Sequence, residues 1–149
     1  SYTTHASELS AAACDAVAAI LCDLIAGQPW QDALSGITND TWPEEIRTIL
    51  AGSWNKHRNE ILSSGYVVHT LEAALWAVGT TSSFEEALIA AVNLGNDADT
   101  VGAVAGQLAG ARYGIRAVPS RWSDMLIDCD KIDNKAKDLV TASIRFAIP

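Results

Sequence analysis

The stretch NLGNDADTVGAVAGQLAGARYG, residues 93–114, predicts a turn followed by a helix built almost entirely from small residues. Asp97, Asp99 and Thr100 stand where that helix begins, and Gly114 stands where it ends. An interior helical glycine costs about 1 kcal/mol relative to alanine. A surface helix has no reason to carry that cost three times. We therefore expect one face to pack closely against another backbone at the centre of a bundle, the face formed by Gly102, Gly106 and Gly110.

Helical patterns recur along the rest of the chain, and strand patterns are nearly absent. The short run GYVV at 65–68 is the one β-type segment, and we expect it to enter a helix. The sequence thus predicts an all-α fold, a compact orthogonal helical bundle forming a single domain over 1–149. The expected helices, placed by apolar spacing and by capping residues, cover 6–26, 29–36, 41–54, 67–78, 83–95, 99–113, 119–129 and 134–147.

Composition excludes several classes of function. The chain has 149 residues, of which 49% are hydrophobic, and its formal net charge is −8 with no basic run. Nucleic-acid binding depends on cationic neutralisation of phosphates, so nucleic acid is not expected as a partner. No apolar stretch reaches the ~20 residues of a membrane span. Three scattered cysteines predict buried thiols in a reducing compartment, hence a cytoplasmic protein.

The segment NDADT, residues 96–100, admits two interpretations. In the first, Asp99 or Thr100 caps the following helix, and Asp97 is a solvated turn residue. In the second, the carboxylates and the hydroxyl bind a hard cation such as Mg²⁺, Mn²⁺ or Ca²⁺. The spacing does not fit an EF-hand, because Val101 and Leu108 fall where that loop needs oxygen ligands. Other segments must then complete any metal site.

Three further groups have alternative interpretations. Thr4–His5 is either a cap beside a surface histidine or a pair that contacts phosphate. Gly65–Tyr66 is either a turn with a core aromatic residue or a platform on which a base stacks. His69 is expected to be a core residue or to support a neighbouring site, without a catalytic role.

Residues 1 to about 125 resemble the ADP-ribosylglycohydrolase family, which includes the dinitrogenase reductase-activating glycohydrolases and the animal ADP-ribose-acceptor hydrolases. The resemblance is carried by the ordered runs GYVV, FEEA, NLGNDADT, AGQLAGARYG and PSRW, and by a Thr-His before the first long helix. It implies an all-helical fold holding two Mg²⁺ (or Mn²⁺) ions in a central cleft. It further implies hydrolysis of the N- or O-glycosidic bond between ADP-ribose and its acceptor.

The same resemblance assigns roles to individual residues. Asp97, Asp99 and Thr100 match part of the family's metal-ligand set. Thr4 and His5 match the substrate-side Thr-His, and Gly65 and Tyr66 match a loop flanking the cleft. The implied ligand is an ADP-ribosylated protein or an ADP-ribose-type small molecule. The resemblance leaves the acceptor open among arginine, serine and a small molecule.

The family's other motifs are missing from this sequence. The G-D-A-x-G and T-D-D-T segments and the acidic residue assigned to catalysis belong to the family's N-terminal half, and none of them occurs here. We therefore expect the C-terminal portion of an enzyme whose necessary partner is the N-terminal portion. The alternative is a non-catalytic descendant that binds ADP-ribose or a protein.

Overall fold

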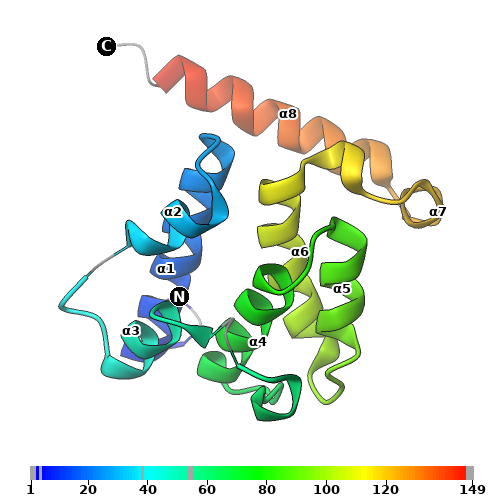
Figure 1. The fold of residues 1–149 in the computed structure, drawn as a ribbon. Coiled ribbons are helices and arrows are strands. Elements are labelled where there is room, and N and C mark those ends of the chain that lie inside the picture. The colour runs from blue at the N-terminus through cyan, green and yellow to red at the C-terminus, as the bar shows by residue number, and fades with distance from the viewer. Residues whose placement is uncertain (1–2, 4, 38, 54–55, 147–149) are drawn as a thin grey trace. The chain divides into compact units, whose positions relative to one another are not determined.

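Helices make up all of the regular structure in residues 3, 5–37, 39–53 and 56–146, which the computed structural model describes (Figure 1). This confirms the all-α prediction for that part of the chain. The α-helices are α1 (Glu8–Ile25), α2 (Trp30–Ser35), α3 (Glu44–Leu50), α4 (Val67–Gly79), α5 (Phe84–Val92), α6 (Ala98–Tyr113), α7 (Ser120–Ser123) and α8 (Cys129–Phe146). Two 3₁₀ turns, η2 (Arg58–Glu60) and η3 (Ile115–Ala117), lie between them.

Capping residues set several of these helix boundaries. Ser7 accepts a hydrogen bond from the Ser10 N–H at the start of α1, and Gly27, with φ of 89°, follows its end. Ser83 accepts from the Glu86 N–H at the start of α5. The Glu86 carboxylate accepts in return from the hydroxyl and the N–H of Ser82. The Ser82 hydroxyl, followed by the Ser82 N–H, lowers the pKa of Glu86 below its ordinary value.

The chain divides into two compact units, residues 1–117 and 118–149. In the first unit, α4 packs against α1, α3, α5 and α6. Its residues 70–78 are all buried, as expected of a helix that is apolar on every side. The fully buried side chains include Ile20 of α1, Leu75 of α4 and Leu108 of α6. The helix at the centre is therefore α4, with α6 packed beside it.

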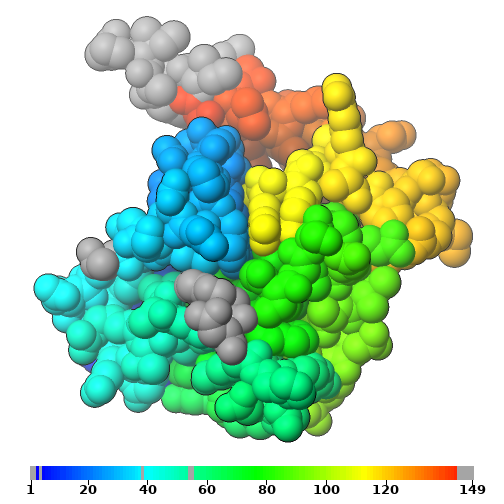
Figure 2. Space-filling model, viewed as in Figure 1, coloured from blue at the N-terminus to red at the C-terminus, as the bar shows by residue number. Residues whose placement is uncertain are grey.

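In the lower part of Figure 2, teal atoms of the segment after α2 lie beside green atoms of the segment that follows. Contacts between α3 and α4 join these segments inside the unit. Cys14 and Cys22 are exposed on α1, so the prediction that these thiols are buried is wrong. They lie on the solvent side of a helix whose inner side carries alanine and isoleucine.

The second unit differs from the predicted helices in its boundaries. The helix expected over 119–129 is only the four-residue α7, and α8 begins earlier than expected, at Cys129. Asp128, with φ of 61°, interrupts the chain between them. No described helix is long and apolar enough to cross a membrane. Nothing in these observations tests the prediction of a single domain, which stays a prediction.

Among the described residues, no other backbone lies within 4 Å of a Cβ built on Gly102, Gly106 or Gly110, so the expected close backbone packing on this face is wrong. A Cβ added at Gly102 would lie 3.2 Å from Cγ2 of Val92, and one added at Gly106 would lie 3.7 Å from Cδ1 of Leu88. Both neighbours are side chains of α5. A Cβ at Gly110 would meet nothing within 4 Å. Gly102 therefore makes room for the Val92 side chain, whereas an added Cβ at Gly106 would make only an ordinary van der Waals contact.

These distances predict different effects of alanine along one helix face. Gly110→Ala should raise the free energy of unfolding by about 0.5–1 kcal/mol, because it removes the helical cost of glycine and meets no neighbour. Gly102→Ala should raise the free energy of unfolding by less than this, or lower it, because the added methyl group crowds the Val92 side chain. Thermal melts of both variants measure the difference. A lower melting temperature for Gly110→Ala would show that this face is covered in solution.

Candidate functional site

Two turns that are distant in sequence are joined by hydrogen bonds from one buried serine. The Asp97 N–H donates to the Ser63 carbonyl at 3.0 Å. The Ser63 hydroxyl donates to the Gly95 carbonyl at 3.1 Å. Ser63 is only 3% exposed, whereas Gly95 and Asp97 are half-buried, so the Ser63 end of each bond is shielded from water. They bring the predicted Gly65–Tyr66 segment, at the entrance of α4, beside the predicted Asp97 segment, at the entrance of α6.

The turn before α6 needs two consecutive residues with positive φ. Gly95 has φ of 80° and Asn96 has φ of 52°. Glycine adopts this region without steric cost, and asparagine is among the few other residues that tolerate it. Leu94 is buried just before the turn. The reversal places Asp97 directly before α6, at its N-cap position.

Asp97 is the N-cap residue of α6, but its side chain makes no capping hydrogen bond. Its Oδ1 instead accepts from the Thr100 hydroxyl at 2.9 Å. An ideal Cβ built on Gly65 would lie 3.4 Å from Oδ2 of Asp97. The prediction of Asp99 or Thr100 as the N-cap was thus wrong in position, because the helix begins at Ala98. The helix leaves the Asp97 carboxylate available for other ligands.

Asp99 and Thr100 lie in the first turn of α6, and both are exposed. A carboxylate here interacts favourably with the positive end of the helix dipole. The Thr100 hydroxyl donates its proton to Asp97, so its oxygen lone pairs remain free to accept. Asp97, Asp99 and Thr100 therefore all lie at the N-terminus of α6, where Thr100 and Asp97 are joined by a hydrogen bond.

The structure does not bring the predicted Thr4–His5 pair to these residues. Thr4 lies outside the described residues. His5 is exposed ahead of α1, and no hydrogen bond among the described residues joins it to the site. The described part of the chain also holds no group of three or more His, Cys, Asp or Glu residues arranged to bind a metal ion. The oxygen atoms at the N-terminus of α6 would therefore supply only part of the ligands that a metal ion needs.

Sequence reasoning missed two residues of this site and undervalued a third. Ser63 and Ser64 stand in a plain polar loop, and His69 was expected only to fill the core or support a neighbour. In the structure, Nδ1 of His69 lies 2.7 Å from the Ser64 hydroxyl. The His69 ring also stands edge-on to the Tyr66 ring, with centroids 5.2 Å apart. A serine five residues before a histidine is not a recognised sequence motif, so the sequence did not indicate this pair.

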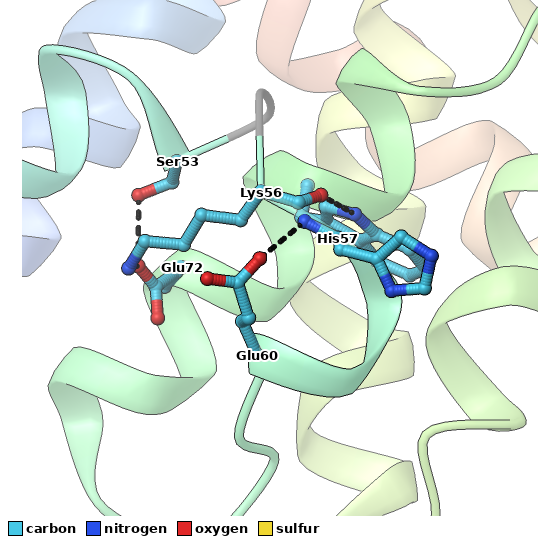
Figure 3. A network of polar contacts seen from close by, with 6 residues as sticks. Ser53, Lys56, His57, Glu60 and Glu72 are labelled. Atoms are coloured by element: carbon cyan, nitrogen blue, oxygen red, sulfur yellow. Dashed lines mark hydrogen bonds and ion pairs between the residues drawn. The ribbon is translucent and has the colours of Figure 1, made fainter.

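A second polar network surrounds Glu72, which is buried on α4 and only 7% exposed. Figure 3 shows Ser53 and Lys56 directed toward it. The Ser53 hydroxyl donates to Oε1 of Glu72 at 3.1 Å, and the Lys56 ammonium pairs with the same oxygen. The Trp76 indole N–H donates to the Lys56 carbonyl. Each group has a partner, and the network fastens the chain after α3 onto α4.

A surface hollow lies elsewhere, beside α2 and α3. Trp42, Arg47 and Leu50 contribute to its lining. The Arg47 Nε–H donates to the Trp42 carbonyl across it. It holds none of the residues predicted for the site, so we assign it no part in the chemistry.

The chain is similar to proteins that act on ADP-ribosyl groups. The family described as ADP-ribosylglycohydrolase matches residues 1–145. An ADP-ribosylarginine hydrolase of Serratia proteamaculans is 44% identical over 142 residues, which are 93% of this chain and 38% of that protein. An ADP-ribosyl-[dinitrogen reductase] glycohydrolase of Rhodospirillum rubrum is 48% identical over 64 residues, 43% of this chain and 22% of that protein.

A solved structure has the same fold over most of the chain. It is described as an ADP-ribosylglycohydrolase-related protein complex and superimposes with a TM-score of 0.74 at 38% identity. The match covers 82% of this chain and 43% of that chain. The chain thus spans about two fifths of the length of the longest-matching relative.

The hydrogen bonds of Ser63 that join the two turns predict a loss of stability in the variant Ser63→Ala. The variant leaves the Gly95 carbonyl without its buried donor, so the free energy of unfolding should fall by about 1–3 kcal/mol. Hydrogen exchange of the Asp97 amide should also become faster. Ser35→Ala is the matched control, because its exposed hydroxyl bonds only within its own helix. Equal stability of both variants would contradict the tie.

Proposed function

Because this chain belongs to the ADP-ribosylglycohydrolase family, we propose that it carries part of the active site of a hydrolase that removes ADP-ribose from an acceptor. The observation that carries the proposal is the Asp97 carboxylate. It stands at a helix N-terminus without capping it, held by Thr100 and adjacent to a glycine.

The cofactor of this site is proposed to be two Mg²⁺ (or Mn²⁺) ions, held in part by Asp97, Asp99 and Thr100. Carboxylate and hydroxyl oxygens are the ligands that these hard cations prefer. The free lone pairs of Thr100 and the uncapped carboxylate of Asp97 fit that role. Bound cations orient ribose hydroxyls and lower the pKa of a water molecule.

The residues of the 63–66 turn are proposed to hold the substrate. Gly65 has no side chain, so a ligand can approach the Asp97 carboxylate. Tyr66 is 45% exposed, so its ring can pack against a nucleoside. Thr4 and His5 remain proposed contacts of the same ligand.

Further groups must complete the site. Three oxygen-bearing residues fall short of the six ligands that octahedral Mg²⁺ requires, and no larger cluster exists among the described residues. We propose that the missing ligands and the catalytic acid come from an N-terminal portion like that of the longer relatives. The acceptor is proposed to be arginine, since the relatives matching 93% of this chain are named ADP-ribosylarginine hydrolases.

The reaction is tested with an ADP-ribosylated arginine peptide and the complete protein that carries this chain. Asp97→Asn and Asp99→Asn should each lower hydrolysis by about 100-fold or more, because each removes a charge opposite the cation. Calorimetry should show weaker Mn²⁺ binding in both. The melting temperature should change little, because asparagine can replace aspartate at a helix start.

Asp15→Asn, an exposed change on α1, is the control and should leave hydrolysis unchanged. Full activity in excess chelator would overturn the metal assignment. ADP-ribose binding with no hydrolysis at any metal concentration would favour the alternative, a descendant that only binds.

A further inference from the structure

His69 contacts both residues that flank Gly65. It lies in the first turn of α4 and is half-buried. Its Nδ1 is 2.7 Å from Oγ of Ser64, and its ring meets the Tyr66 ring edge-on at an interplanar angle of 86°. One imidazole therefore touches the turn before and after the glycine that faces Asp97.

The donor and acceptor roles of Ser64 and His69 depend on the imidazole tautomer, and we assign Ser64 as the donor. The Tyr66 N–H donates to Oγ of Ser64 at 3.4 Å, so the serine oxygen already accepts one proton. The Ser64 hydroxyl can then donate its own proton to Nδ1 of a neutral His69, which leaves the imidazole proton on Nε2. A chain of donors runs from the Tyr66 backbone through Ser64 to His69, and such chains strengthen one another.

The turn needs this support, because the start of α4 has no side-chain cap. Tyr66 is the N-cap residue and makes no capping bond with its side chain. On the other side of the turn, Ser63 is fixed to Gly95 and Asp97. Gly65 therefore lies between two anchors, one at Ser63 and one at the Ser64–His69 pair.

We propose that His69 is a positioning residue that holds the Gly65–Tyr66 turn in its substrate-binding conformation through Ser64. The inference rests on the proposed function, because the ligand is the ADP-ribosyl group of that reaction. His69 touches neither Asp97 nor Thr100 by any hydrogen bond among the described residues. Its loss should therefore weaken ligand binding while leaving the metal ligands and the rate of the bound complex intact.

Two substitutions separate the two ring nitrogens. In His69→Asn the amide oxygen can occupy the place of Nδ1 and accept from Ser64, whereas in His69→Gln the amide lies near the place of Nε2. Measured in the complete protein, His69→Gln and Ser64→Ala should each raise KM for an ADP-ribosylated arginine peptide about 5- to 10-fold, with kcat within about twofold. His69→Asn should stay within about twofold of wild type in both constants.

Calorimetry with free ADP-ribose should show the same order of affinities. The double variant Ser64→Ala/His69→Gln should be no weaker than either single variant, because the pair acts as one unit. ¹⁵N spectra of the wild type, recorded for the neutral imidazole, should show an unprotonated Nδ1 and a protonated Nε2.

Three results would overturn the proposal: His69→Asn as impaired as His69→Gln, wild-type constants in every variant, or a fall in kcat at unchanged KM. Failure of the proposed function is a different result, in which the wild type neither binds ADP-ribose nor hydrolyses the peptide. In that case the positioning role falls with it.

Discussion

The double hydrogen bond of Ser63 is the constraint on which the site depends. One residue accepts from the Asp97 N–H and donates to the Gly95 carbonyl. These partners are 32 or more residues away along the chain. Because Ser63 is buried, its own hydroxyl and carbonyl are shielded from water, and the two bonds hold the turns in a fixed relation. Asp97 and Gly65 meet because of this tie.

The surrounding helices make the tie rigid. Both turns lead directly into helices of the core, the first into α4 and the second into α6, and these two helices pack against each other. The Glu72 network fastens the preceding segment to the same α4. Burial of Leu75, Val78 and Leu108 favours this arrangement through the hydrophobic effect, which has no directional preference. The hydrogen bonds of the turns are directional, and they fix the orientation of the two turns relative to each other.

The sequence was sufficient for the fold class and for many helix ends, because caps and apolar spacing act over a few residues. Ser83, Gly27 and Gly114 mark boundaries where they were expected, whereas the Ser7 cap of α1 was not predicted. The same local reasoning identified Asp97 and Gly65 separately. It could not join them, because the Ser63 bonds span distant segments and leave no periodic pattern. The prediction of backbone packing at the glycines of α6 failed for a related reason. The side chains beside Gly102 and Gly106 belong to α5, and the sequence of α6 does not indicate them.

The central claim is that the joined turns present Asp97 and its neighbours as part of a cation site. The most direct measurement is anomalous diffraction from crystals of the complete protein soaked in Mn²⁺. The account predicts an anomalous peak within coordination distance, about 2.0–2.4 Å, of the Asp97 carboxylate and with Asp99 or Thr100 as a second ligand. Ordered crystals that show manganese elsewhere, or none beside Asp97 at saturating Mn²⁺, would contradict it.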